Sequence, residues 1–291
     1  MIDWNVTRYR ASGDRVRTVS GHVFARVFGR ERAGVPLLVL HGFPTSSHDF
    51  CAVAEGLSGR RPVILFDFLG YGLSDKPEHY GYSLFEQADT ALEVLRAVRP
   101  DGEEVDVLAH DMGTSVLCEL LARRERGLLP VTLRSIAFTN GSVFVEMASL
   151  TLGQRLLRSK LGPAFSLLNT RATFEAQLAR VFAKKPPTEV LSAMSELCAR
   201  ENGFTRLPQL IRYVEERTRF AERWHGALAT WEKPALVAWG ERDPVAVMPI
   251  GERLARTLPR GELVRWSGVG HYPQVEAPEA FVSVVGSFFE R

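Results

Sequence analysis

The tract Val107-Leu-Ala-His-Asp-Met-Gly-Thr114 carries the first candidate for chemistry. An apolar run ends in small-x-Asp-x-small and then passes into a helical pattern, which is the nucleophile-elbow arrangement with an aspartate where G-x-S-x-G has a serine. Asp111 would project at the N-terminus of the following helix, where the helix dipole favours the ionised carboxylate that a nucleophile requires. Aspartate is also a good helix N-cap, so this tract alone leaves a purely structural role open.

Two later tracts supply an acid and a histidine in the chain order that a nucleophile elbow requires. Val237-Ala-Trp-Gly-Glu-Arg-Asp-Pro-Val245 is an apolar strand followed by a turn that presents Asp243. Gly268-Val-Gly-His-Tyr-Pro273 presents His271 on a glycine-flanked loop. Glu241 is the nearest rival to Asp243 and is predicted to be a surface residue. We therefore expect Asp111, His271 and Asp243 to be the catalytic residues.

The early tract His41-Gly-Phe-Pro44 directly follows an apolar strand and predicts an oxyanion hole. Its donors are expected to be the backbone N–H groups of Phe43 and Met112. His41 is predicted to be a structural hydrogen-bonding residue, and His110 a neighbour that shapes the elbow. The tract from Asp67 to Pro77 predicts a rigid loop beside the site, with structural aspartates. No metal or organic cofactor is implied.

Buried strands and helices that alternate along the chain must position these residues. Apolar runs stopped by glycine or polar residues predict strands, and helical patterns lie between several of them. This alternation is typical of an α/β fold with a mostly parallel sheet. The predicted elements are a strand pair over 16–28, strands over 36–42, 62–67, 105–109, 135–139, 235–239 and 263–266, and helices over 84–98, 115–124 and from residue 277.

The strand rhythm stops between residues 142 and 225, where leucines, alanines and charges recur at helical spacing. We predict a helical cap over 142–225, inserted into a hydrolase core made of 1–141 and 226–291. Its thirteen Arg and Lys against eight Glu are typical of a solvated helix surface. Residues 150–168 predict an amphipathic helix pair whose leucines face the core, with peripheral membrane contact as the less favoured interpretation.

Composition excludes several classes of protein. A net charge of +2 without long basic runs argues against a nucleic-acid partner. Three widely spaced cysteines suggest neither a disulfide framework nor a zinc site. The first residues lack a continuous apolar segment, and no stretch approaches the roughly 18 apolar residues of a membrane span. We expect a soluble cytoplasmic protein whose partners are a small apolar substrate and water, while its oligomeric state stays open.

The whole set of motifs resembles the epoxide hydrolase and haloalkane dehalogenase branch of the α/β-hydrolases. Within that branch it looks closest to the mesoderm-specific transcript (MEST)-like proteins. The resemblance spans nearly the whole chain and implies the α/β-hydrolase fold. It rests on His41-Gly-Phe-Pro, the tract from Asp67 to Pro77, His110-Asp-Met-Gly, Thr139-Asn-Gly141, Arg223-Trp-His-Gly-Ala-Leu228 and His271-Tyr-Pro-Gln-Val-Glu. The hydrophobic N-terminal extension of the animal proteins is absent, so a membrane location is not carried over.

The resemblance implies an alkyl ester of Asp111, which water activated by His271 then hydrolyses. Haloalkane dehalogenases usually bind the halide through a tryptophan and an asparagine at the positions that carry Met112 and Phe43 here. Epoxide hydrolases ordinarily use two cap tyrosines as proton donors. Tyr213 is the single tyrosine between residues 142 and 231. It is the possible ring-opening proton donor or a packing residue, and its partner stays unassigned.

Three functions follow from these observations. An epoxide hydrolase that converts an epoxide into a vicinal diol is the leading prediction. A haloalkane or haloacid dehalogenase is the alternative within the same chemistry, although the elbow offers no arginine for a substrate carboxylate. A non-catalytic interaction protein on a hydrolase fold is the alternative of another class.

Overall fold

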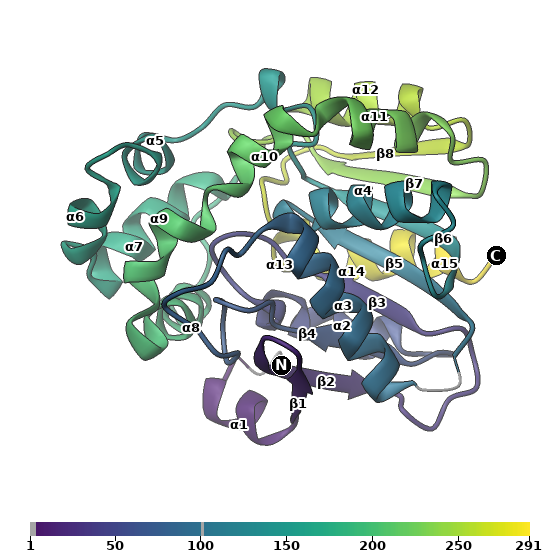
Figure 1. Ribbon diagram of the computed structural model, residues 1–291, viewed down its shortest axis with the longest axis horizontal. Coiled ribbons are helices and arrows are strands. Elements are labelled where there is room, and N and C mark those ends of the chain that lie inside the picture. Colours follow the sequence, from purple (N-terminus) through teal and green to yellow (C-terminus); the bar gives the residue numbers. More distant parts are fainter. Residues whose placement is uncertain (1–3, 100–101) are drawn as a thin grey trace.

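A sheet of eight strands forms the centre of the computed structural model, which describes residues 4–99 and 102–291 (Figure 1). Its order is β1-β2-β4-β3-β5-β6-β7-β8. β1, β2 and β4 pair antiparallel, and all other neighbours pair parallel. The strands are β1 (Asp14–Thr18), β2 (Gly21–Phe28), β3 (Leu37–Leu40), β4 (Val63–Phe66), β5 (Glu104–His110), β6 (Thr132–Thr139), β7 (Ala235–Gly240) and β8 (Gly261–Trp266). The predicted α/β-hydrolase fold is confirmed.

Helices cover both faces of the sheet, which explains why its inner strands are apolar at every position. In β3, Leu38 and Leu40 belong to the core shared with α3 and α4, whereas Leu37 and Val39 belong to the core shared with α2 and α14. The core helices are α1 (Val6–Ala11), α2 (Cys51–Leu57), α3 (Leu84–Val98), α4 (Met112–Glu125), α11 (Ala221–Ala229), α12 (Met248–Thr257), α13 (Pro273–Glu276), α14 (Pro278–Phe281) and α15 (Ser287–Phe289).

The segment between β6 and β7 is helical, and no strand lies among its residues, all of which the structure describes. Figure 1 shows its first helices beside the carboxyl ends of the strands, apart from the helices that flank the sheet. They are α5 (Leu152–Arg158), α6 (Gly162–Leu167), α7 (Arg171–Leu178), α8 (Thr188–Ala199), α9 (Leu207–Leu210) and α10 (Tyr213–Arg219). We call α5 to α10 the cap helices.

The predicted second boundary of the cap, after residue 225, falls inside α11. This helix is tied to α4, because Glu119 accepts hydrogen bonds from Arg223 at 2.8 Å and from the indole N–H of Trp224 at 3.0 Å. The division of the chain into core and cap at residues 142–225 stays a prediction. None of the described helices has the length and apolar character needed to cross a membrane.

The predicted helix pair over 150–168 exists as α5 and α6, but the favoured orientation of its leucines is wrong. Leu157 is buried, as predicted. Leu152, Leu161, Leu167 and Leu168 are instead among the most exposed large hydrophobic side chains described. The reason is that these helices are only 7 and 6 residues long and lie at the outer edge of the cap, where one buried side suffices to attach them.

Candidate active site

Asp111 lies at the turn between β5 and α4 and has an unusual backbone conformation, with φ 47° and ψ −113°. A non-glycine residue in this region is strained, and such strain is concentrated at functional sites. The turn also needs small neighbours. A Cβ on Gly113 would collide with the carbonyl oxygen of Leu40, and one on Gly42 would lie 2.5 Å from the Cβ of Asp111. The elbow motif therefore specifies a backbone that glycine alone permits at these points.

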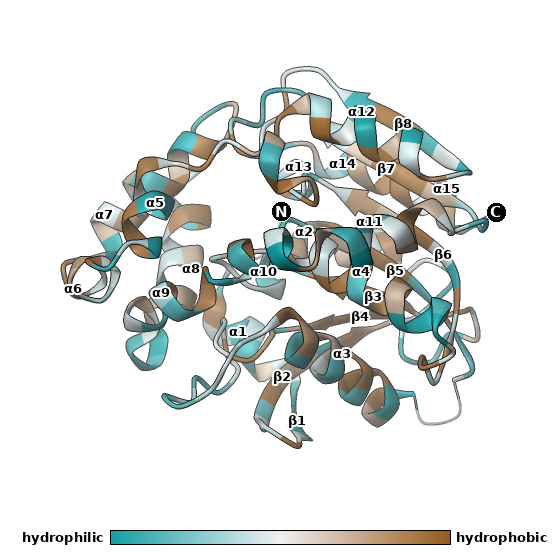
Figure 2. Ribbon diagram, turned by 45° about the horizontal axis from the view of Figure 1, so that its top comes forward, coloured by the Kyte–Doolittle hydropathy of each residue, from teal (hydrophilic) through white to brown (hydrophobic). Residues whose placement is uncertain are grey.

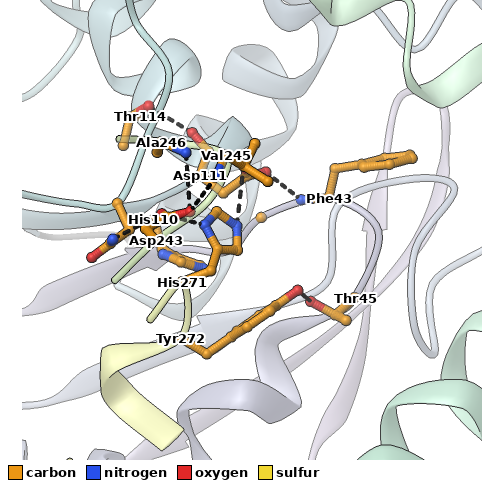
Figure 3. Close-up of polar contacts among 12 residues, drawn as sticks. Phe43, Thr45, His110, Asp111, Thr114, Asp243, Val245, Ala246, His271 and Tyr272 are labelled. Carbon is orange, nitrogen blue, oxygen red and sulfur yellow. Dashed lines mark hydrogen bonds and ion pairs between the residues drawn. The ribbon is translucent and has the colours of Figure 1, made fainter. Parts of the chain in front are cut away.

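The carboxylate of Asp111 faces the site and does not cap its own helix. Its Oδ1 accepts a hydrogen bond from the backbone N–H of Phe43 at 2.8 Å, and its Oδ2 lies 3.7 Å from Nε2 of His271 (Figure 3). Only 2% of the residue is exposed. The side chain of Asp111 therefore does not act as the helix cap that the sequence left open as an alternative.

The imidazole of His271 bridges the two aspartates (Figure 3). Its Nδ1 lies 2.6 Å from Oδ2 of Asp243, opposite the side that faces Asp111. Oδ1 of Asp243 accepts hydrogen bonds from the backbone N–H groups of Val245 at 2.8 Å and Ala246 at 3.0 Å. These contacts fix Nδ1 as the nitrogen that binds the acid and leave Nε2 directed at Asp111. The structure thus brings together all three residues predicted as a triad.

Asn140 completes this arrangement and was not singled out for a role in the sequence. Its amide donates to Oδ2 of Asp243 at 2.8 Å and its oxygen accepts from the backbone N–H of Gly240 at 2.9 Å. It directly follows β6, so it lies at the same carboxyl edge of the sheet as Asp111 and Asp243. A polar residue immediately after a buried parallel strand was the signal that could have identified it.

The charges around His271 control its protonation. Burial lowers the pKa of the imidazole, but the Asp243 carboxylate, the hydrogen bond to it and the Asp111 carboxylate outweigh burial and raise the pKa to about 9. The resting site therefore contains an imidazolium between two carboxylates at neutral pH. Because one of those carboxylates is Asp111, any reaction that neutralises Asp111 also lowers the pKa of His271.

The other predicted neighbours occupy structural positions. His41 accepts a hydrogen bond from the backbone N–H of Phe68 at 3.0 Å, and its other ring nitrogen lies 2.9 Å from the carbonyl of Gly42. Burial lowers the pKa of His41 and that of His110, whose ring lies 5.0 Å from that of His271. Glu241 is exposed, which fits its prediction as a surface residue.

The two predicted oxyanion donors come from separate parts of the chain. The backbone N–H of Phe43 donates to Oδ1 of Asp111, so this donor is directed at the carboxylate. Met112 is the first residue of α4, where backbone N–H groups lack an acceptor within the helix. The side chain of Met112 accepts a hydrogen bond from the hydroxyl of Tyr71 at 3.1 Å. Tyr71 comes from the loop of residues 67–77, outside the cap, and lies beside the elbow.

Tyr213 begins α10 and is 2% exposed. Its ring lies 5.7 Å from that of Phe43, and its hydroxyl forms no hydrogen bond with any residue that the structure describes. Burial and the charge of Asp111 raise its pKa, although Arg217 opposes them. Burial, Tyr213 and Asp111 likewise raise the pKa of Tyr71. The charge of Asp111 therefore acts on both phenols, and both stay protonated.

Arg217 links this part of the cap to the elbow. Its guanidinium donates to Oγ of Ser115 at 2.7 Å and to the backbone carbonyl of Asp111 at 3.1 Å, and it lies 4.6 Å from the ring centre of Tyr213. No carboxylate among the described residues forms an ion pair with it, although it is 2% exposed. Its spacing of four residues from Tyr213, which places both on one helix face, was the signal that the sequence offered.

A pocket extends from His271 into the cap. The core contributes Phe43, Pro44, Val245 and Tyr272, and the cap contributes residues of α5 and α7. Among the described residues, no cluster of three or more His, Cys, Asp or Glu is placed to bind a metal ion. The arrangement suits a small, largely apolar molecule that reaches His271.

Known proteins resemble the chain over most of its length. It is 44% identical to the putative hydrolase LipZ of Mycobacterium tuberculosis over 285 residues, which cover 97% of this chain and 96% of LipZ. It is 34% identical to the mouse mesoderm-specific transcript protein, covering 90% and 82% of the two chains. A loop variant of the haloalkane dehalogenase DbeA from Bradyrhizobium elkanii shares the fold, with a TM-score of 0.80, 24% identity and 96% coverage of both chains. The family model for the alpha/beta hydrolase fold matches residues 35–278, and the chain belongs to that family.

Proposed function

We propose that this α/β hydrolase opens epoxides by forming an alkyl ester on Asp111 and then hydrolyses that ester to a vicinal diol. One observation carries the proposal. A carboxylate, rather than a hydroxyl, occupies the strained elbow and faces both His271 and the backbone N–H of Phe43. A carboxylate is suited to displacement at saturated carbon, and the product of that displacement is an ester.

In the first step, a carboxylate oxygen of Asp111 attacks an epoxide carbon and the carbon–oxygen bond of the ring breaks. The oxygen that leaves takes a proton from the hydroxyl of Tyr213, which becomes a phenolate. That hydroxyl has no hydrogen-bond partner among the described residues, which supports this role, because an unpaired donor is available to a substrate oxygen. Arg217, 4.6 Å from the ring centre, would stabilise the phenolate.

Esterification then changes the state of His271. The negative charge of Asp111 is lost, so the pKa of the imidazolium falls from about 9 and its proton returns to the Tyr213 phenolate. The neutral His271 can now remove a proton from water, which attacks the carbonyl carbon of the ester. Phe43 and Met112 stabilise the oxyanion that forms. Collapse of that intermediate releases the diol and restores the Asp111 carboxylate and the His271 imidazolium, so the protons balance over the cycle.

Tyr71 is our candidate for the second phenol. It approaches the elbow from the core loop, where its hydroxyl has the thioether of Met112 as its acceptor at 3.1 Å. A thioether is a weak acceptor, so a substrate oxygen would compete well for this donor. In this arrangement Tyr71 binds the epoxide oxygen and Tyr213 supplies the proton.

The proposal is tested by trapping the ester. In a His271→Gln variant mixed with an epoxide, Asp111 should become alkylated and stay so, because the water that hydrolyses the ester is no longer activated. Mass spectrometry of the peptide that contains Asp111 should show the mass of the intact epoxide added. Asp111→Asn should abolish the adduct while leaving the melting temperature nearly unchanged, since an amide oxygen can still accept from Phe43.

A single turnover in ¹⁸O-labelled water distinguishes this route from direct attack of water on the epoxide. The ester route places the label in the Asp111 carboxylate, because water attacks the ester carbonyl. Direct hydration places it in the diol and would overturn the proposal. Failure of a broad panel of aliphatic and aryl epoxides to react at all would also count against it.

Haloalkane dehalogenation is the second candidate, and the likeness to DbeA favours it. The same ester would form, with halide in place of the alkoxide. Neither Phe43 nor Met112 offers a side-chain N–H to bind the halide. The guanidinium of Arg217 donates to Ser115 and to the Asp111 carbonyl. Release of chloride or bromide from haloalkanes or haloacids, at rates above those for epoxides, would establish this alternative.

A further inference from the structure

The outer helices of the cap expose a group of leucines. Four of the six large hydrophobic side chains that are exposed in residues 4–99 and 102–291 lie on or beside α5 and α6, each with 67 to 76% of its surface accessible. In both views α5 and α6 form the outer edge of the cap, away from the sheet (Figures 1 and 2). Single exposed leucines are ordinary, but a group on one short segment marks an interaction site. The four, which we call the leucine patch, are Leu152, Leu161, Leu167 and Leu168.

The chain around the leucine patch carries only positive charge. Residues 147–174 contain no Asp or Glu but four basic residues. Arg158 pairs with Glu215 at 2.8 Å, and Arg171 donates to Ser192 and Ser195. Arg155 and Lys160 are exposed and form no ion pair with any described carboxylate. The leucine patch is therefore bordered by two cations that are not neutralised within the described protein.

The leucine patch also borders the pocket that leads to His271. Thr151 and Gly153 line this pocket and flank Leu152, while Asn169 lines it and directly follows Leu168. α5 thus carries an exposed leucine and also contributes Gly153, Gln154 and Leu157 to the pocket, while α6 ends just before Asn169.

We propose that α5 and α6 form a docking surface for an anionic lipid bilayer. The leucine patch would enter the boundary between headgroups and acyl chains, and Arg155 and Lys160 would lie against lipid phosphates, as in other amphipathic surface helices. A second copy of this chain is the less favourable occupant, because two such surfaces would bring like charges together without any acid in the segment. Docking would bring the helix that lines the pocket, α5, to the membrane, where apolar substrates accumulate.

Cosedimentation with lipid vesicles tests this inference independently of the reaction. We would compare vesicles of phosphatidylcholine alone with vesicles of equal parts phosphatidylcholine and phosphatidylglycerol. The wild-type protein should bind the anionic vesicles, and the double variant Leu167→Ser, Leu168→Ser should reduce its partition coefficient at least about tenfold, because two leucines no longer enter the bilayer. Leu128→Ser is the matched control, since Leu128 is 67% exposed outside the cap and should change binding less than about twofold.

A charge variant separates the two contributions. Arg155→Glu, Lys160→Glu should abolish the preference for anionic vesicles, whereas Arg256→Glu, Arg260→Glu, on and just after α12, should retain it. Thermal melting of each variant excludes misfolding as the cause. The inference is overturned if the wild-type protein binds neither vesicle type, or if the Leu167 and Leu168 variant binds as well as the Leu128 control. It is also overturned if sedimentation velocity shows a dimer that the leucine substitutions dissociate, because a second copy would then cover the patch.

Discussion

On the core side of the site, Asp243 accepts hydrogen bonds from Asn140, Val245, Ala246 and His271, all within 3.0 Å. On the cap side, the hydroxyl of Tyr213 has no hydrogen-bond partner among the described residues, and ring contacts with Phe43 and Arg217 position it. The acid that orients the histidine is thus fully bound before substrate arrives. The proposed proton donor is oriented by packing and left free for a substrate oxygen.

This difference indicates that the core side orients the reacting groups, whereas the cap side determines which substrate is accepted. The core side needs a fixed geometry, since a misplaced general base loses much of its effect, and backbone N–H groups give that rigidity. On the cap side, the proposed reaction needs a donor for the leaving oxygen, and a phenol without a partner among the described residues is suited to that role. Substitutions on the core side should therefore cost more than those on the cap side, and the cost on the cap side should depend on the substrate.

The largest effect is expected from Asp243→Asn. The amide removes the charge that raises the pKa of His271 and stabilises its imidazolium, so turnover should fall by roughly 10³ to 10⁴ fold. Glu241→Gln is the matched control, because Glu241 lies in the same turn but is exposed, and should retain nearly full turnover. Steady-state kinetics on an epoxide measures both. If both variants lost turnover equally, the buried Asp243 and the exposed Glu241 could not be assigned different roles.

Tyr213→Phe should slow epoxide opening by about 10² fold, the lower end of the usual contribution of a general acid. Tyr80→Phe, at a half-buried tyrosine outside the cap helices, is the control. Any haloalkane that the enzyme accepts should be insensitive to both changes, because a halide leaves without a proton. A Tyr213 variant as active on epoxides as its control would show that Tyr213 only packs.

Arg217→Met should reduce turnover of epoxides by roughly tenfold, since Arg217 acts through Tyr213 and the elbow rather than on the substrate. The loss should fall on kcat rather than on KM, because the cation stabilises the phenolate that forms during the proposed first step. Arg217→Lys should recover part of the rate. Arg219→Met, on the exposed side of the same helix, controls for helix stability. A loss confined to KM, with kcat unchanged, would indicate a structural role alone.

The smallest effect concerns protonation. NMR titration of His271 should give a midpoint near 9 in the free protein, and Asp111→Asn should lower it because one carboxylate is lost. The folded pKa lies above the unfolded value of about 6.5. The stability from this imidazolium is therefore fully present below about pH 6.5 and is lost as the pH rises through 9. The melting temperature of the wild-type protein, relative to His271→Gln, should decline over that window; a constant difference would contradict the assignment.

The core side of the site could be predicted because the residues that determine its geometry are close together in the sequence. A strand that ends in small-x-Asp-x-small specifies its own turn, since Gly113 must avoid the carbonyl of Leu40 and Asp111 must adopt a positive φ. The turn after β7 likewise provides the two N–H groups that bind Asp243. Residues within a few positions of one another produce these features, so the sequence displays them directly.

The sequence by itself determined the alternating strands and helices, the elbow with its aspartate, and the chain order of the acid and the histidine, because short-range sterics and apolar periodicity dictate them. Only the tertiary structure decided what lies around them. Asn140 meets Asp243 across 103 positions, Arg217 meets Ser115 across 102, and Tyr71 approaches the elbow from a core loop. The exposure of the α5 and α6 leucines is equally a tertiary result, since an apolar face shows in the sequence but the surface that covers it does not.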